Sequence, residues 1–410
     1  MFRFAATSVL ALGLAAPALA DVTPAQVWEN LQSYSADYGY QVTGTVDDAG
    51  GTLTVTDAVF STSSDTGSSS VTFPKMIFRE TGDARVRVVV EGDVALDSRF
   101  AVPVPAEDAP EAAPDGTEAP ADPAPAETPE TVEMTMTGTV SLPGNEMVVS
   151  GTPEDMLYEY SYPSVAFDFT LPAEPGQDAT IPLTGTITSL AGSQRNVASD
   201  GGTASTFDLK AAQVAMRIDA EMPPSQDGAG GTIDLQVALT NLTSQGSGQT
   251  PGQSFDLGTQ MAQALAAGLT LDTTLAFESL EGSFDIAGQD ENGQDQTGQG
   301  SFASGASDIA VRLSGQGMGY EASVADNRAE LTLNTVPFPI SYAVQRISGQ
   351  MQIPVTGGDA AQPFKLAYAL EEVLEPLILE GGMEKLYAKH GLHYELPGLY
   401  QDVENDVAGR

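Results

Sequence analysis

The stretch TIDLQVALT, residues 232–240, decides how this chain folds. Every second residue in it is apolar, namely Ile233, Leu235, Val237 and Leu239. Successive side chains of a β-strand point to opposite faces of its sheet. The stretch therefore predicts a strand with one buried face and one wet face. This is typical of antiparallel sheets, because the strands of parallel sheets form continuous apolar runs.

The same alternation recurs along most of the chain and makes the fold class clear. It is found at Thr52–Thr56, Arg85–Val90, Met134/Met136, Val165/Phe167/Phe169/Leu171, Val214/Met216/Ile218, Ile309/Val311/Leu313, Leu331/Leu333 and Ile340/Tyr342/Val344. Turn residues such as Asp200-Gly201-Gly202 separate these segments. We expect a mainly β protein: a long antiparallel meander that forms a curved sheet, a sandwich or an open barrel, with short helices packed on its apolar face.

Two short helices are predicted within this pattern. The first follows Thr23-Pro24-Ala25-Gln26, which has the form of a capping box with Pro at the first helical position, and it ends before Gly39. Its apolar face comprises Val27, Leu31, Tyr34 and Tyr38. The second spans 259–267, with Met261, Ala264 and Leu265 on one face and Gly268 as its C-cap.

Composition divides the chain into five parts. These are a signal peptide at 1–20, an N-terminal helix with the first strands at 21–100, an acidic Pro/Ala-rich disordered loop at 101–131, the main β-meander at 132–370, and an atypical, partly helical tail at 371–410. The first part combines Arg3, an apolar stretch and the small-residue site Ala18-Leu19-Ala20. We expect export and cleavage after Ala20, which places the protein in the periplasm or, as the alternative, outside the cell. No later stretch is apolar for long enough to be a second membrane anchor.

The segment 101–131 is compositionally unlike its neighbours. It holds eight Pro, nine Ala and eight acidic residues, and it has neither an aromatic nor a basic residue. Such a segment cannot bury enough apolar surface to offset the entropy of ordering its backbone. We expect a long loop between two adjacent strands, and an interdomain linker is the alternative.

Charge and cysteine content exclude several function classes. The formal net charge is -40, from 56 acidic and 16 basic residues, so the chain has no basic surface with which to neutralise nucleic-acid phosphates. The chain contains no Cys, which excludes disulfides, thiolate metal sites and cysteine nucleophiles.

Motifs for catalysis or metal binding do not emerge from the sequence. His390 and His393, near Glu384 and Glu395, are the one grouping that suggests zinc, but Gly391 between the two His breaks the helix that would place them on one face. The loop Asp290–Asp295 fails the EF-hand pattern, because the position that requires Gly is occupied by Asp. We therefore expect no metal and no cofactor.

Carboxylates and arginines are best explained structurally. Asp168 with Glu159, or Asp234 with Asp256, are pairs that a glycoside hydrolase would need, but a chain with 56 carboxylates contains such pairs by chance. The strand arginines Arg85, Arg87, Arg217, Arg312, Arg328 and Arg346 are expected to form cross-strand ion pairs on the wet face.

The remaining hypothesis concerns the apolar face of the sheet. If the helices do not fill it, a hydrophobic groove remains, and acyl chains or other apolar metabolites are its natural occupants in the periplasm. We expect a non-enzymatic envelope protein that binds an apolar ligand such as a lipid, or an envelope component. A cell-wall or polysaccharide hydrolase and a structural or adhesive envelope protein are the alternatives.

Several motifs resemble a known family. They are Val27-Trp28-Glu29-Asn30-Leu31-Gln32-Ser33-Tyr34, Gly39–Gly44, Ser150–Met156 with Tyr158 and Tyr160, and Pro363–Tyr368. Over residues 21–372 the chain is similar to the exported alphaproteobacterial family called domain of unknown function 2125. The resemblance implies a location in the cell envelope, and it implies no activity and no catalytic residue.

Overall fold

The computed structural model describes residues 22–37, 39–64, 67–103, 131–172, 180–199, 201–222, 229–253, 255, 260–289, 293–353 and 365–371. It contains two helices, α1 (Pro24–Asp37) and α2 (Met261–Ala266), and one sheet of 18 strands. The strands are β1 (Gln41–Ala49), β2 (Thr52–Ser64), β3 (Gly67–Glu80), β4 (Arg85–Glu91), β5 (Val94–Pro103), β6 (Thr131–Ser141), β7 (Glu146–Thr152), β8 (Asp155–Pro172), β9 (Thr180–Ser199), β10 (Gly202–Met222), β11 (Ala229–Pro251), β12 (Thr270–Phe277), β13 (Ser279–Gln289), β14 (Asp295–Ser304), β15 (Ser307–Ser314), β16 (Gly317–Leu333), β17 (Ile340–Ile353) and β18 (Lys365–Glu371). The mainly β class is confirmed.

The sheet is an antiparallel meander in which neighbours in sequence are neighbours in space. β4 and β5 lie end to end and both pair with β3. In the same way β6 and β7 pair with β8, β12 and β13 with β11, and β14 and β15 with β16. We call each such pair, and each single long strand, a line. Each line pairs with the next one along the chain, from β1 to β18. Most connections in the sheet are short, as is usual for antiparallel architectures, and the longest one joins β5 to β6.

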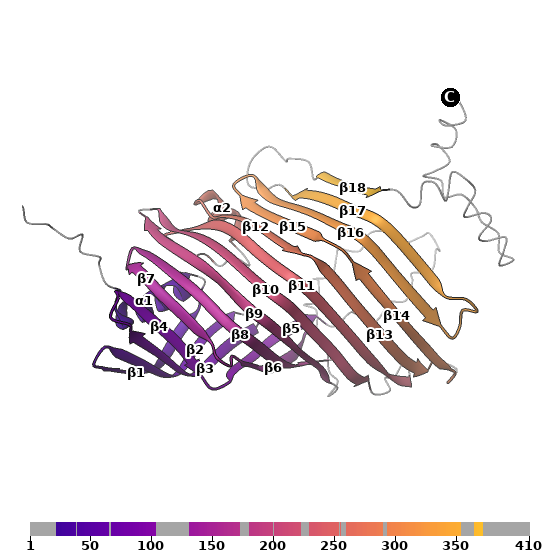
Figure 1. The fold of residues 1–410 in the computed structure, drawn as a ribbon, viewed down its shortest axis with the longest axis horizontal. Coiled ribbons are helices and arrows are strands. Elements are labelled where there is room, and N and C mark those ends of the chain that lie inside the picture. The colour runs from indigo at the N-terminus through magenta and orange to yellow at the C-terminus, as the bar shows by residue number, and fades with distance from the viewer. Residues whose placement is uncertain are drawn as a thin grey trace, which may run out of the picture.

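Of the three shapes that the pattern allowed, the sheet adopts the curved one. Figure 1 shows β2 to β6 lying behind the broad layer formed by β8 to β17, with α1 between them at the N-terminal end. Within the described residues, β1 pairs with β2 alone and β18 with β17 alone, so the sheet is open at these two edges.

A line of irregularities, which we call the crease, crosses the sheet from strand to strand. Its members with positive φ are Asp57 (50°), Ser189 (52°), Asn241 (49°) and Asp326 (47°). Between them lie the breaks that separate the collinear strands at 92–93, 142–145, 278 and 305–306. At each irregularity the regular strand pattern is interrupted, and short polar side chains tolerate the left-handed backbone found at Asp57, Ser189, Asn241 and Asp326.

The crease also shifts the phase of the alternation without changing the face. On β11, the apolar positions are odd-numbered before Asn241, as in Leu239, and even-numbered after it, as in Leu242. The register shows the same shift on β10, where Val214 pairs with Leu239 and Ala211 pairs with Leu242. One face therefore stays free of charged residues along these two strands, of which β11 has 23 residues.

The buried core lies where α1 meets the sheet. It consists of Val22, Val27, Trp28, Leu53, Val55, Ala58, Met76, Phe78, Val86, Val88, Met147, Val149, Met156 and Tyr158. The ring of Trp28 is 4 % exposed and packs edge-on against Phe60 and Phe78, with centroids 6.2 and 5.9 Å apart. The core therefore joins α1 to β2, β3, β4, β7 and β8.

Both predicted helices are present. At the start of α1, Thr23 N donates to Gln26 Oε1 (2.9 Å) and Gln26 N donates to Thr23 Oγ1 (3.3 Å), which is the predicted capping box. In α2, Ala264 and Leu265 are buried as expected, but Met261 is 36 % exposed because it is the first residue of the helix.

The strands on either side of the acidic Pro/Ala-rich segment are neighbours. β5 and β6 pair from Val94↔Val140 to Pro103↔Thr131. Residues 104–130 between them lie outside the described residues, as do the predicted signal peptide 1–20 and residues 372–410 of the predicted tail.

Candidate functional site

The two faces of the sheet differ completely in chemistry. We call the face that carries α1 the inner face and the opposite one the outer face. Residues directly opposite each other on antiparallel strands point to the same face. The register therefore assigns each strand residue to a face, starting from the core residues that contact α1, such as Phe78 and Tyr158.

On the inner face, two rows of apolar residues and glycine cross the sheet from β8 to β17. The first row is Phe169, Leu183, Ile218, Leu235, Phe284, Gly300, Leu331 and Ile340. The second row is Phe167, Gly185, Met216, Val237, Gly282, Phe302, Ala329 and Tyr342. Each member is directly opposite the next, and we call the two rows together the apolar strip.

The inner face becomes more exposed with distance from α1. Val55 and Phe78, near the helix, are 0 % exposed. The members of the strip on β8 to β16 are half-buried, whereas Ile340 and Tyr342 at its far end are 45 % and 52 % exposed. α1 therefore seals one end of the inner face and leaves the strip accessible to solvent.

Phenylalanine rings lie over glycines along this face. Five Gly–Phe pairs are directly opposite each other on neighbouring strands: Gly138–Phe169, Gly185–Phe167, Gly246–Phe207, Gly282–Phe302 and Gly300–Phe284. In each pair, a Cβ added to the glycine would collide with the ring, as at 2.6 Å from Phe284 Cζ for Gly300. The rings thus cover the glycine backbone, an arrangement known to stabilise glycine in sheets.

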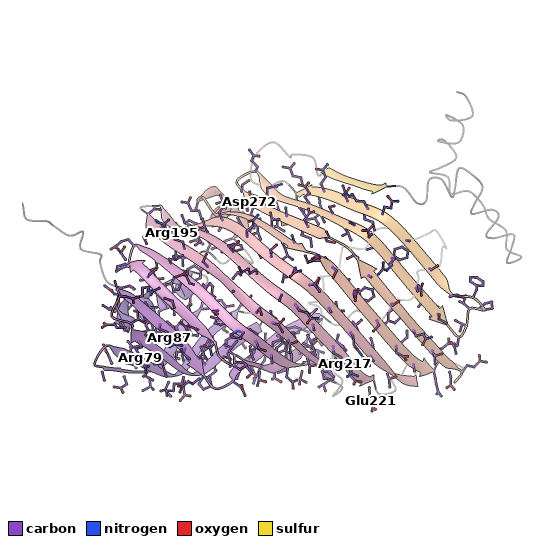
Figure 2. The ribbon with its side chains drawn as sticks, in the orientation of Figure 1. Arg79, Arg87, Arg195, Arg217, Glu221 and Asp272 are labelled. Atoms are coloured by element: carbon purple, nitrogen blue, oxygen red, sulfur yellow. The ribbon has the colours of Figure 1, made fainter. Side chains whose placement is uncertain are left out.

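On β8 to β17, charge is confined to the outer face, whereas nearer α1 Asp48 and Glu80 have inner-face register positions, opposite Leu53 and Val86. Within the described residues of β8 to β17, every Asp, Glu, Lys and Arg has an outer-face register position, apart from Asp326 in the crease. Figure 2 shows Arg195, Arg217 and Asp272 spread far apart across this layer. The inner face of these strands therefore has no charge with which to bind an ionic ligand.

Six arginines among the described residues form ion pairs, several of them across strands, whereas Arg328 and Arg346, for which such pairs were expected, form none within the described residues. Arg87 contacts Glu146 (2.7 Å), Arg217 contacts Asp234 (2.9 Å), and Arg312 contacts Asp272 (3.7 Å). Arg85 pairs instead with Asp83 in the turn before its strand, and this guanidinium, with the Thr81 hydroxyl, lowers the pKa of Asp83 to about 2. All nine ion pairs among the described residues are at least 36 % exposed, so each contributes little to stability.

A network of uncharged polar groups lies on the inner face beside α1. Tyr158 Oη donates to Asn30 Oδ1 of the helix (2.5 Å), and Tyr160 Oη donates to Gln194 Oε1 (3.2 Å). Gln194 Nε2 in turn donates to Asn196 Oδ1 (3.0 Å). Burial raises the pKa of both tyrosine hydroxyls, so they stay neutral donors. These contacts attach α1 to β8 and β9 without introducing a charge.

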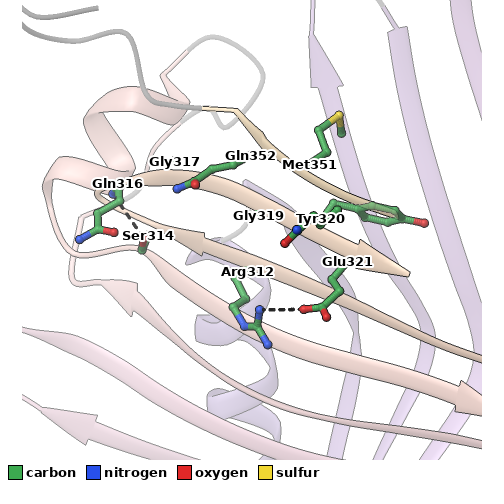
Figure 3. A pocket seen from close by; sticks show the side chains of 10 residues that line it. Arg312, Ser314, Gln316, Gly317, Gly319, Tyr320, Glu321, Met351 and Gln352 are labelled. Carbon is green, nitrogen blue, oxygen red and sulfur yellow. Dashed lines mark hydrogen bonds and ion pairs between the residues drawn. The ribbon is translucent and has the colours of Figure 1, made fainter. Parts of the chain in front are cut away.

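A hollow of about 540 Å³ lies at the upper ends of β15 to β17. Figure 3 shows that Arg312 and Glu321 face each other in it, 3.6 Å apart, with Ser314 and Gln316 at its end. Its one basic and one acidic side chain thus neutralise each other. It offers neither a metal-binding group nor a nucleophile with an adjacent base.

The structure does not bring the first carboxylate pair together. Asp168 and Glu159 both have outer-face positions on β8, nine residues and therefore roughly 30 Å apart. A glycosidase needs its carboxyl groups about 5 to 10 Å apart. Of the second pair, Asp234 contacts Arg217, and Asp256 lies outside the described residues, as do His390 and His393.

No cluster of three or more His, Cys, Asp or Glu side chains among the described residues could hold a metal ion. Neither α1 nor α2 is long and apolar enough to cross a membrane, and the described part of the chain has no other helix.

The sequence already contained a signal for the strip that alternation of apolar residues alone does not reveal. Gly282, Gly298 and Gly300 stand at positions in phase with the apolar residues of their strands. A glycine at such a position marks a place where a neighbouring side chain approaches the backbone closely. The partner of each glycine follows only from the register.

Comparison with known proteins adds no further assignment. No protein-family model, curated protein or solved structure matches this chain.

Proposed function

We propose that this is an exported protein of the cell envelope that binds an apolar ligand, of the lipid class, on the inner face of its sheet and catalyses no reaction. The observation that carries the proposal is the apolar strip. It crosses from β8 to β17 without a charged residue, and its members are half-buried or exposed. Exposed apolar surface of this extent is unfavourable in water and typically marks a binding surface.

The arrangement of charge supports the same function. The formal net charge is -40, and the charged side chains on β8 to β17 have outer-face positions, which keeps such a β-rich protein soluble and discourages association through its outer surface. It also argues against a nucleic-acid partner. What remains for recognition is the uncharged inner face.

Export is supported by residues 1–20, which have the composition of a signal peptide. We place the mature protein, beginning after Ala20, in the periplasm. The motifs from Val27 to Tyr34 and from Ser150 to Met156, through which the chain resembles domain of unknown function 2125, agree with that location and add no residue role.

Native mass spectrometry of the protein purified from its own periplasm, without detergent, tests the proposal. We expect one or more bound species with lipid masses that solvent extraction releases. A clean apo mass, together with failure to take up lipid from vesicles, would show that the inner face does not bind lipids.

A further inference from the structure

The apolar strip is elongated in the direction that crosses the strands. Its rows cross eight strands, which corresponds to roughly 34 Å at about 4.8 Å per strand, and they lie about 7 Å apart along the strands. The strip is thus long and exposed on one side, and a neighbouring row, Ile233, Ile286, Gly298 and Leu333, widens the apolar surface from β11 to β16. A compact rigid ligand would contact only a small part of it, whereas an extended hydrocarbon chain can contact it along its length.

The surface of the strip is suited to such a chain. Gly185, Gly282 and Gly300 contribute no side chain, and the rings of Phe167, Phe302 and Phe284 cover them. Neither row contains a charged group, and the single hydroxyl, Tyr342 Oη, already donates to Asn327 Oδ1 (2.6 Å). A ligand on the strip is therefore held by burial of its apolar surface, with no ionic partner for its polar end.

The polar end of an amphiphile bound there must reach water, and the charge around the strip is negative. The outer face beside it carries Asp219, Glu221 and Asp285, and Figure 2 places Glu221 at the lower edge of the sheet. Among the residues next to strip members in sequence, six are acidic and two, Arg217 and Arg328, are basic. Arg217 is already in contact with Asp219 (2.8 Å) and Asp234 (2.9 Å). The surrounding potential therefore disfavours an anionic headgroup and tolerates a neutral or zwitterionic one.

We infer that the strip binds the acyl chains of lipids whose headgroup has no net negative charge, with the chains laid across the strands over the Gly–Phe pairs. This inference rests on the proposed function and specifies its ligand class. Like-charge repulsion supplies the headgroup selectivity, since the inner face has no group that would recognise a particular headgroup.

The test for the headgroup uses one set of vesicles. The mature protein is incubated with vesicles of equimolar phosphatidylcholine and phosphatidylglycerol with identical acyl chains, re-isolated, and its bound lipids are quantified by mass spectrometry. We expect a bound ratio of roughly fivefold or more in favour of phosphatidylcholine at low salt, falling toward one at about 0.5 M NaCl because salt screens the repulsion.

The possible outcomes distinguish the headgroup selectivity from lipid binding itself. Binding of both lipids at a ratio near one, or a preference for phosphatidylglycerol, would overturn the headgroup inference and leave lipid binding in place. Absence of any bound lipid would overturn the proposed function itself.

A matched pair of variants tests whether the acyl chains of the bound lipid lie on the strip. Leu235→Glu places a charge in the middle of the strip, and Gln236→Glu places the same charge on the adjacent exposed residue of the outer face. We expect at least about a tenfold loss of bound lipid for the first and less than about a twofold change for the second.

A second pair of variants keeps the test possible if Leu235→Glu does not fold. Ile340 is 45 % exposed, so Ile340→Glu should fold, and Ser341→Glu on the other face is its control. Equal lipid binding by both members of each folded pair would place the ligand elsewhere.

Discussion

Phe284 on β13 and Gly300 on β14 are directly opposite each other on the inner face, and the ring covers the glycine so closely that a Cβ on Gly300 would lie 2.6 Å from Phe284 Cζ. The same Cβ would lie 2.7 Å from the carbonyl oxygen of Glu330 on β16. A methyl group therefore fits at this position only if both the ring and a strand move.

Gly300→Ala should lower the free energy of unfolding by about 1–3 kcal/mol, because overpacking displaces the ring and the neighbouring strand. Gly288→Ala, also in β13–β14 and on the inner face, is the control: its added Cβ would meet nothing closer than 3.6 Å. Urea denaturation measures both, and we expect the control to change stability by about 0.5 kcal/mol or less. Equal effects would contradict the close contact described for Gly300.

Phe78→Ala should destabilise the protein by about 3–5 kcal/mol, because Phe78 is 0 % exposed and packs against Trp28. Trp28 is the single tryptophan, so its fluorescence should shift to the red as water reaches the core. Phe100→Ala is the same substitution at a 38 % exposed site and should cost less than about 2 kcal/mol. A small effect at Phe78 would show that α1 and β3 are not packed as described.

Asp155→Asn should reduce stability at pH 7 by at most about 1 kcal/mol, since Asp155 and Arg195 form an exposed ion pair. Arg195 lowers the pKa of Asp155 in the folded protein. The contribution is therefore fully present above the unfolded-state pKa of about 3.9, and it is lost as the pH falls through the lower folded-state pKa.

Denaturation curves from pH 2 to pH 7 check this dependence. The difference between wild type and Asp155→Asn should be constant above about pH 5 and should shrink below about pH 4. In a double-mutant cycle with Arg195→Gln, the second substitution should add nothing further. A difference that grows on acidification would contradict the assigned sign.

Asp285→Lys should stabilise the protein by about 0.2–1 kcal/mol. Asp285 on β13 is directly opposite Asp234 on β11, which is itself opposite Asp219 on β10, so three carboxylates stand in one row with Arg217 contacting two of them. The gain should disappear in about 1 M NaCl, where charges are screened within a few ångströms.

Ser283→Lys is the control for that gain. It adds the same charge to the same strand and face, but directly opposite Gln236 and Ser301. Thermal melts should show a smaller change than for Asp285→Lys, and an equal gain would indicate a general effect of net charge.

The positions of the strands, and which alternate residues of each strand are apolar, could be predicted from the sequence because they depend on local periodicity. Residues 232–240 alternate strictly, and the capping box at Thr23 and Gln26 specified where α1 begins. The crease could not be predicted in the same way. The irregularity at Asn241 changes the phase of the alternation, and in the sequence it resembles a polar substitution. Only the pairing shows that β10 changes phase at the same level, with Val214 opposite Leu239 and Ala211 opposite Leu242.

The candidate site was predictable only in outline. An apolar face with no charged residue follows from alternation alone, as in Ile233 to Leu239, whose intervening residues are polar. The pairing of Phe167 with Gly185, or of Phe302 with Gly282, required the register, because the partners are separated by a turn whose length the sequence pattern does not determine.

By itself, the sequence determined that this chain forms an antiparallel meander with one apolar face, that its charge lies on the other face, and that it lacks every chemistry that depends on cysteine. These properties follow from residue type and from periods of two residues, which are local. Only the tertiary structure decided that α1 covers the face at Phe78 and leaves it exposed at Ile340. Coverage depends on the curvature of the sheet and on contacts between distant segments, and these arise from the sum of many strand twists and bulges that no local pattern contains.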